Sequence, residues 1–316
     1  MKKVLFTAVA LLLLLNFKPA LAQQYPVFTQ YYFNELVINP AYAGNHIQLS
    51  ATSIYRNQWV NLPGAPRTFS VSAHTALLKS KIGVGFLVNH DEIGSYKNDH
   101  VYAMYSYMLR FPKATLSMGL QAGVNIVGAN FSKLNLQNPD DASFAPFTGL
   151  KPNFGAGIYY NKKNYFIGFS VPFLINSSVS TSGGGFTSII DQIRQRRYYF
   201  LRGGAVFPLG GNPNVKVNPS ILLRTQEGQP VSLDLNYAFI FYDAFSVGAS
   251  WRSGDAFITF INLKLSEKVY FAYSYDWTSS ALNHFSNGSH EFLINFRTRI
   301  RGVHKNVECP GYYDYR

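Results

Sequence analysis

The chain has 316 residues and a formal net charge of +12, with 14% charged residues, 16% aromatic residues and one cysteine. Soluble domains are nearer a quarter charged, so this low-charge, aromatic-rich balance is unusual for one. The basic residues are scattered along the chain, so nucleic acid is not an expected partner. Cys309 excludes an internal disulfide and leaves either an ordinary packed side chain or a bond to another chain.

Residues 1–22 predict a secretory signal peptide. Lys2 and Lys3 form a charged start, an apolar run follows, and Ala20 and Ala22 match the small-x-small cleavage pattern. The run is too short to cross a bilayer core of roughly 30 Å. Cleavage removes three lysines and lowers the formal charge from +12 to +9. No later stretch reaches the roughly eighteen apolar residues that a membrane helix needs.

Residues 23–46 are rich in aromatics and prolines, and Asn39-Pro40 and Ala43-Gly44 are turn signals within them. The segment does not alternate well enough for a spanning strand. We expect a structured N-terminal arm that packs beneath or inside a barrel.

From Ile47 onward, polar and apolar residues alternate with period two, which predicts strands. Each segment is about as long as a tilted membrane strand requires, roughly nine to eleven residues or slightly more. The fourteen expected strands are 47–56, 67–78, 81–90, 99–110, 114–127, 152–161, 164–173, 197–208, 214–225, 230–242, 245–252, 255–265, 268–276 and 289–299.

The two faces separate well in several of these strands. In 230–242, Leu235, Tyr237 and Phe239 lie opposite Asp234 and Asn236. Lipid outside and a polar lumen inside would select this pattern, although a soluble sandwich also alternates. The sequence also places aromatics near strand ends, as expected for interfacial girdles or from ordinary strand preference. These aromatics are Tyr159, Tyr160, Tyr198, Tyr199, Trp251, Tyr273, Tyr275 and Trp277.

Loop length separates a membrane barrel from a sandwich. The even-numbered connections are all tight, while the odd-numbered ones include every long one, with short exceptions at 226–229 and 253–254. The long connections are 57–66, 91–98, 128–151, 174–196 and 277–288. Short turns on one rim and longer loops on the other predict an all-β transmembrane antiparallel barrel over 47–299. An even strand number places the N-terminal arm 23–46 and a C-terminal tail 300–316 on the short-turn, periplasmic rim.

No motif predicts catalysis, a cofactor or a metal. His290-Glu291 and His90-Asp91-Glu92 lack a second histidine at ligand spacing, and Asp140-Asp141 lacks the spaced ligands of a calcium loop. The glycines 183–185 lead into no phosphate-binding pattern. Ser70, Ser72 and His74 share one strand face, as any polar lumen stripe would, so hydrolase activity is not expected. Arg194, Arg196 and Arg197 suit lipid headgroups, an acidic partner or a solvated rim equally.

Several motifs near the N-terminus resemble those of the PorP/SprF family of outer-membrane proteins. They are 30–34 (QYYFN), 38–44 (INPAYAG), 55–59 (YRNQW), 64–66 (GAP), 72–75 (SAHT) and 83–85 (GVG) leading to Asp91 and Ile93-Gly94. Glu35 departs from the pattern, since the family often has proline there. The resemblance covers almost the whole chain after the signal peptide.

The resemblance implies a role in type IX secretion and gliding motility of Bacteroidetes. Its implied partners are a secreted surface adhesin with a type B C-terminal domain, and periplasmic components linked to peptidoglycan. We expect partner contacts at Tyr55, Arg56, Asn57, Gln58, Trp59, Asn39, Pro40 and Tyr42. The alternative for 55–59 is a rim-stabilising cluster in which Arg56 pairs with backbone carbonyls and Trp59 anchors at headgroup depth.

The leading hypothesis is a non-enzymatic barrel that supports secretion or surface anchoring of such an adhesin. The alternative is an outer-membrane pore for small or hydrophobic solutes, because fourteen strands enclose room for a channel or a plug. An open lumen would favour the pore, and a filled lumen would favour anchoring.

Overall fold

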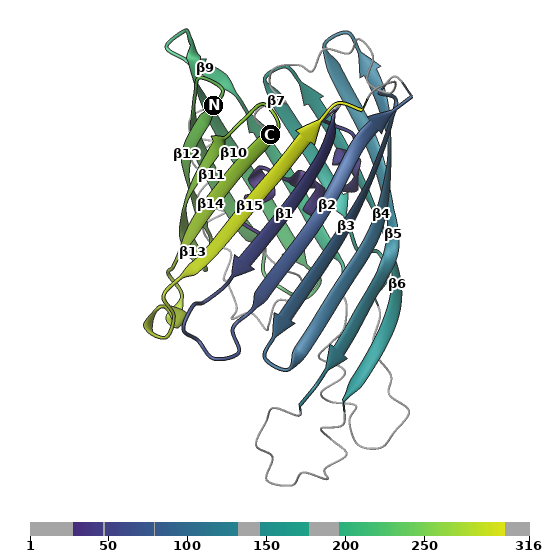
Figure 1. The fold of residues 1–316 in the computed structure, drawn as a ribbon, viewed down its shortest axis with the longest axis vertical. Coiled ribbons are helices and arrows are strands. Elements are labelled where there is room, and N and C mark those ends of the chain that lie inside the picture. Colours follow the sequence, from purple (N-terminus) through teal and green to yellow (C-terminus); the bar gives the residue numbers. More distant parts are fainter. Residues whose placement is uncertain (1–27, 47, 79, 132–145, 177–195, 301–316) are drawn as a thin grey trace, which may run out of the picture.

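The computed structural model describes residues 28–46, 48–78, 80–131, 146–176 and 196–300, and within them the chain forms one antiparallel sheet curled into a barrel (Figure 1). The strands are β1 (Leu49–Asn57), β2 (Arg67–Leu77), β3 (Ile82–Ile93), β4 (Tyr96–Phe111), β5 (Ala114–Ala129), β6 (Phe147–Lys162), β7 (Tyr165–Val171), β8 (Tyr198–Ala205), β9 (Phe207–Leu209), β10 (Asn212–Gln226), β11 (Ser232–Phe241), β12 (Phe245–Arg252), β13 (Ala256–Lys264), β14 (Val269–Thr278) and β15 (Ser289–Thr298). Only Val206 separates β8 from β9, and both pair with β10. Counted as one interrupted strand, they give the predicted fourteen.

The sheet closes where the last strand meets the first. β1 pairs with β15 in antiparallel register, from Leu49 opposite Thr298 to Asn57 opposite His290. The other pairings join neighbours in the chain, with β8 and β9 acting as one. Closure gives backbone groups at the would-be edges a partner, which hydrocarbon surroundings demand. The predicted all-β barrel and its closing pair are confirmed.

The two faces of the strands differ as the alternation predicts. In β11, Leu235, Tyr237 and Phe239 are exposed on the outside, while Asp234 and Asn236 are buried on the inside. An apolar outer face suits lipid, and a polar inner face suits a lumen. No helix in the described part of the chain is long and apolar enough to span a bilayer.

The connections sort by rim, with one correction. β3 continues to Ile93 and β4 begins at Tyr96, so the expected long loop 91–98 is a tight turn at Gly94-Ser95. The polar residues 91 and 92 were predicted to lie in a loop, but they continue the pairing of β3 with β4 beyond the expected strand end at residue 90. The longest connections, 130–146 and 172–197, lie on the same rim, and the 279–288 connection contains a 3-10 helix, η6 (Ala281–His284). The other rim has only short turns (top in Figure 1).

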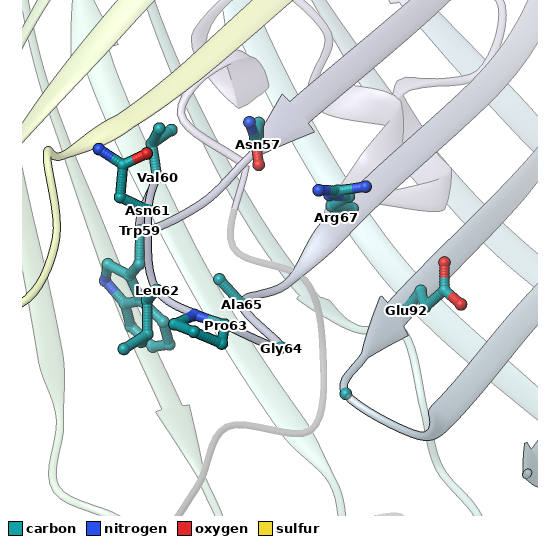
Figure 2. Close-up of a pocket in the computed structure, with 11 residues that line it drawn as sticks. Asn57, Trp59, Val60, Asn61, Leu62, Pro63, Gly64, Ala65, Arg67 and Glu92 are labelled. Atoms are coloured by element: carbon teal, nitrogen blue, oxygen red, sulfur yellow. The ribbon is translucent and has the colours of Figure 1, made fainter. Parts of the chain in front are cut away.

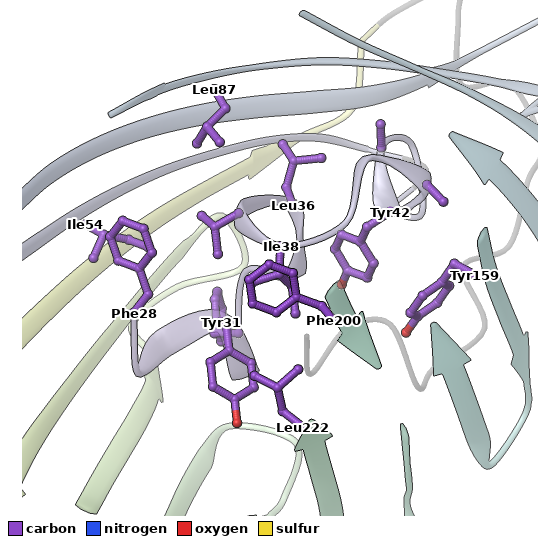
Figure 3. Packing of buried hydrophobic residues seen from close by; sticks show 14 of the residues in the cluster. Phe28, Tyr31, Leu36, Ile38, Tyr42, Ile54, Leu87, Tyr159, Phe200 and Leu222 are labelled. Atoms are coloured by element: carbon purple, nitrogen blue, oxygen red, sulfur yellow. The ribbon is translucent and has the colours of Figure 1, made fainter. Parts of the chain in front are cut away.

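The core of the molecule lies in the lumen. Three short 3-10 helices, η1 (Gln30–Tyr32), η2 (Glu35–Val37) and η3 (Pro40–Tyr42), pack against the inner wall as one apolar cluster (Figure 3). Tyr159 and Tyr198 belong to this cluster and are buried. Two explanations were open for these aromatics, outer girdles and ordinary strand preference. The girdle does not apply to Tyr159 and Tyr198, because both side chains face the lumen. The signal peptide, the tail after Ile300, Cys309 and Asp140-Asp141 lie outside the described residues.

Candidate functional site

The segment 28–46, which we call the arm, fills the lumen. Every residue in it is buried, and Leu36, Ala41 and Tyr42 are at most 1% exposed. Local chemistry explains its shape at η3. The Asn39 side chain accepts a hydrogen bond from the Ala41 amide at 2.9 Å, and Pro40 occupies the first helical position, where no amide donor is needed. The arm is therefore a folded core element.

One end of the arm is held by a buried charge cluster near the long-loop rim. The backbone amides of Thr29 and Gln30 donate to Glu291 at 2.9 and 2.7 Å. Arg56 donates to Glu291 at 2.9 Å and to Asp276 at 2.7 Å, and these three side chains are at most 3% exposed. Buried charges are tolerated only when they are paired and hydrogen-bonded, as here. The cluster joins β1, β14 and β15 to the arm.

A second ion pair lies in the middle of the arm. Arg202 on β8 pairs with Glu35 at 3.0 Å and donates to the Tyr31 carbonyl oxygen at 2.8 Å. Its guanidinium lies 5.1 and 5.2 Å from the ring centroids of Tyr31 and Phe166, within cation–π range. Glu35, the departure from the family pattern, thus has a defined role, because it neutralises a buried arginine.

The Tyr31 phenol lies deep in the lumen. Asn236 donates to its oxygen at 2.9 Å. Burial, together with the nearby Asp234 carboxylate, raises the pKa of Tyr31 well above its usual range. The phenol is therefore neutral at physiological pH and adds no charge to the arm.

The other end of the arm approaches the wall closely. A Cβ on Gly83 would collide with the Ala43 carbonyl, and one on Gly119 would collide with the Ala41 backbone. Ser106 donates to the Ala43 carbonyl at 2.6 Å, which secures the contact. The backbone of the arm and the backbone of the wall meet here with no side chain between them, so the wall is shaped to this sequence.

Histidine and tyrosine rings pack together below this contact. His74 Nδ1 accepts a hydrogen bond from the Gly44 amide at 3.1 Å, and Tyr42 packs on His74, His46 and Tyr159 at centroid distances of 5.7, 5.7 and 5.5 Å. His74 Nδ1 thus serves as an acceptor that holds the arm. Its neighbour Ser72 accepts from Asn34 at 2.9 Å.

The remaining motif histidines lie next to one polar partner each. His90 lies 2.5 Å from Asp99, and His290 lies 2.8 Å from the Tyr273 hydroxyl. No group of three or more potential metal ligands occurs among the residues that the structure describes. Arg197 pairs with Glu227 at 3.2 Å, and Arg196 donates to the Glu227 carbonyl oxygen at 3.0 Å, so both brace the rim. Arg194 and the glycines 183–185 lie outside the described residues.

The loop after β1 forms a pocket of about 490 Å³ on the long-loop rim (Figure 2). It is tied down on both sides: Val60 donates to the Gly288 carbonyl at 2.9 Å, and Gly94 donates to the Gly64 carbonyl at 3.0 Å. The lining residues are Asn57, Trp59, Val60, Asn61, Leu62, Pro63, Gly64, Ala65, Arg67, Glu92 and Gly94. The pocket is thus a formed hollow with aromatic, apolar and charged walls.

The residues expected to contact a partner fall into two groups. Asn39, Pro40, Tyr42 and Arg56 are buried in the lumen, and Gln58 is 9% exposed. Tyr55 points outward at 44% exposure, and Asn57 and Trp59 line the rim pocket. The alternative for Arg56 needs amending, because it binds two carboxylates where backbone carbonyls were expected.

Sequence reasoning missed the role of the buried charged residues around the arm. Glu35, Arg202, Asp276 and Glu291 belong to or contact the arm, and Asp234 and Arg252 pair with each other beside Asp276. A signal existed: most of them stand at inward positions of otherwise apolar or weakly polar strands, in a chain with only 14% charged residues. A charge that faces a membrane lumen is costly unless it is paired, so each one indicates a partner inside.

A closed antiparallel barrel with an apolar outer face and a filled lumen defines the class as a plugged outer-membrane β-barrel. The family model described as "Type IX secretion system membrane protein PorP/SprF" matches residues 20–296. The chain therefore belongs to the PorP/SprF family, a non-enzymatic barrel family, and is an outer-membrane component of the type IX secretion system. No curated protein matches it.

Solved structures are similar in fold at low identity. The CymD monoaromatic hydrocarbon channel is 11% identical with a TM-score of 0.47, covering 90% of this chain and 96% of that one. The outer membrane protein Omp33 of Acinetobacter baumannii is 10% identical with a TM-score of 0.43, covering 81% of this chain and 100% of that one. The KdgM porin is 8% identical with a TM-score of 0.36, covering 79% and 99%.

Proposed function

We propose that this protein is a non-conducting scaffold of the type IX apparatus that supports secretion or surface anchoring of an adhesin with a type B C-terminal domain. The observation that carries the proposal is the filled lumen. The side chains of the arm are buried and its backbone touches the wall, so the described part of the lumen is occupied at this level, which supports a barrel that does not conduct. A barrel that does not conduct is available to hold partners at its two rims.

The long-loop rim is the proposed cargo side. The long connections cluster there, and outer-membrane barrels direct their longer loops outward and their short turns to the periplasm. The rim pocket supplies a preformed hollow in which Trp59 and Leu62 offer apolar surface, and Arg67 and Glu92 offer both charges. Tyr55, Asn57 and Trp59 remain the predicted contact residues that reach this rim or the outer wall beside it.

The short-turn rim is the proposed periplasmic side. Leu49 at the start of β1 and Thr298 at the end of β15 pair on this rim, so the wall of the barrel begins and ends there. Residues 300–316 would then meet periplasmic components that link the barrel to peptidoglycan. Asn39, Pro40, Tyr42 and Arg56 would support such contacts indirectly, by holding the arm.

The alternative of a solute pore makes the opposite prediction for the lumen. A pore for small or hydrophobic molecules needs a continuous water-filled or apolar channel. The described lumen instead contains a packed arm bound by two ion-pair clusters. The arm would have to leave or rearrange for transport.

Gene deletion in the native bacterium tests the proposal. Loss of one or more type IX cargo proteins from the cell surface, restored by the wild-type gene, is the expected result. Complementation with Trp59→Ala should restore less surface cargo than complementation with Trp251→Ala, a tryptophan on the outer wall that does not line the pocket. Normal secretion and attachment of every cargo in the deletion strain would refute the proposal, as would steady ion conductance of the purified barrel in planar bilayers.

A further inference from the structure

The two rims of the barrel differ in charge. At the ends of the strands on the short-turn rim, the described residues include nine basic and two acidic side chains, a net of +7. The basic ones are Lys81, Arg110, Lys113, Lys162, Lys163, Lys216, Lys264, Lys268 and Arg299, and the acidic ones are Asp243 and Glu267. Among the described residues of the long-loop rim, four basic and four acidic side chains are exposed or half-buried. They are Arg67, Lys97, Arg196 and Arg197, and Glu92, Asp99, Glu227 and Asp255.

The excess positive charge is not cancelled within the described structure. Lys216 pairs with Asp243, and Lys264 pairs with Glu267. Five further basic side chains on this rim are exposed and make no ion pair with any other described residue. They are Lys81, Lys113, Lys163, Lys268 and Arg299. On the long-loop rim, by contrast, Lys97 pairs with Glu92, Arg197 with Glu227 and Arg252 with Asp255.

Large apolar side chains accompany the basic ones. Leu78, Phe111, Tyr165, Tyr242 and Leu265 stand at the short turns and are 47–74% exposed. The Lys162 ammonium lies 5.3 Å from the ring centroid of Tyr165, so the two kinds of side chain touch directly.

Two of these apolar residues occupy backbone positions that favour glycine or asparagine. Leu78 has φ +47 and Tyr242 has φ +50, in turns where a bulky residue costs conformational energy. Nothing in the described part of the protein covers either side chain. A contact between these apolar side chains and a surface outside the barrel would offset the conformational energy of the two turns.

We propose that this basic and apolar collar binds the phosphate groups of anionic phospholipids in the leaflet that surrounds the short-turn rim. Exposed apolar tips enter the boundary between headgroups and acyl chains, while lysines at the same level reach the phosphates. This surface is separate from the rim pocket, and the inference does not depend on the cargo role.

The distribution of the collar favours lipid over an acidic protein. Unpaired basic residues stand beside the turns at 78–81, 112–113, 163–164 and 265–268, and Arg299 follows β15. In the order of the sheet they extend from β13 through β15 and β1 to β7, which is more than half of the rim. A protein would cover one sector of the rim, whereas headgroups surround the whole of it. The outward strand faces just above these turns are apolar, which places the collar at the membrane boundary.

Lipid binding is tested on the folded full-length mature protein. The protein is reconstituted with equimolar phosphatidylglycerol and phosphatidylcholine, extracted in mild detergent, and its retained lipids are counted by native mass spectrometry. Wild type is expected to retain phosphatidylglycerol in preference to phosphatidylcholine. The triple variant Lys113→Gln, Lys163→Gln, Lys268→Gln should lower that preference by about fivefold for each lysine removed, at low salt.

The matched control removes three positive charges from the other rim: Arg67→Gln, Lys97→Gln, Arg197→Gln. It should retain the wild-type preference, and high salt should reduce the preference of wild type. Heat-modifiable migration on gels verifies that each variant is a folded barrel. The proposal is overturned if wild type shows no preference for the anionic lipid, or if the collar and control variants lose it equally. It is also overturned if the collar variant keeps its lipid but loses an acidic protein from the rim.

Discussion

The Arg56→Met variant tests whether buried charge holds the arm in the lumen. Arg56 is 2% exposed and donates to Glu291 at 2.9 Å, to Asp276 at 2.7 Å and to the Thr29 hydroxyl at 3.2 Å. Its removal leaves Glu291 buried without a cation and leaves Asp276 with only the longer pair to Arg252, at 3.8 Å. Breaking a buried pair on one side costs about 3–5 kcal/mol. Because 1.4 kcal/mol corresponds to tenfold, the docked state of the arm should weaken by roughly a hundred-fold to a few thousand-fold.

Three measurements report this loss. The midpoint of denaturant unfolding should fall, limited proteolysis should cut the arm faster, and planar bilayers should show openings that wild type lacks. Arg67→Met is the matched control, because Arg67 lies opposite Asn57 on the neighbouring strand, is exposed, and has no ion-pair partner among the described residues. It should behave as wild type does.

Rescue separates charge from packing. Adding Asp276→Asn and Glu291→Gln to Arg56→Met removes the stranded charges, and neutral replacement of a whole buried ion cluster is often close to neutral in stability. The triple variant should therefore recover most of the loss. The reasoning fails if Arg56→Met matches wild type in all three assays, or if the triple variant is as unstable as the single one.

Three further predictions address the arm and the rim. Gly119→Val should unseat the arm, because its side chain would occupy the space of the Ala41 backbone; proteolysis of the arm reports this, and unchanged protection would contradict the close contact. Asn39→Ala should cost about 1 kcal/mol for the lost cap, measured by denaturant unfolding, and no change would show the cap to be idle. The hydrogen bond from Asn176, and then the charge of Arg197, lower the pKa of Glu227 below its ordinary 4.5. Contacts to this carboxylate should hold at neutral pH and be lost only as the pH falls below 4.5. Amide protection at residues 174–176, corrected for the intrinsic effect of pH on exchange, should fall over the same pH range, and constant protection would refute this.

The fold could be predicted from the sequence because lipid imposes one strict rule. Apolar residues must face outward at every second position, and this alternation marked all fourteen strands, including β11 and the closing strand β15. Errors arose where the rule stops applying. β3 continues through the polar residues His90 to Glu92 because strands extend beyond the hydrocarbon, where alternation is no longer required. Tyr159 and Tyr198 lie near strand ends, where girdle aromatics also lie, but both stand at inward positions and pack in the luminal cluster.

The candidate site was less predictable because its partners are far apart in the chain. Arg56 meets Glu291 and Asp276 only when the barrel closes, at separations of 235 and 220 residues. The motif at 38–44 indicated a structured arm, but not that it would lie against glycines of β3 and β5. Asn39, Pro40 and Tyr42 were expected at an interface for a partner, and their buried positions show how an internal contact and an external one look alike in sequence.

The position of the charge cluster couples the arm to closure of the barrel. Arg56 on β1 and Glu291 on β15 are direct cross-strand partners at the seam, and both hold Thr29 at the start of the arm. If the seam closed first, two opposite charges would be sealed beside an empty lumen, and Glu291 would lack the two amide donors that satisfy it. If the arm were in place first, the backbone amides of Thr29 and Gln30 would already lie where Glu291 on the last strand must pack. The arm is therefore better described as the core around which the sheet closes than as a plug inserted into a finished pore. The same reasoning explains why the few buried charges near the arm, Arg56, Arg202, Asp276 and Glu291, occur in pairs.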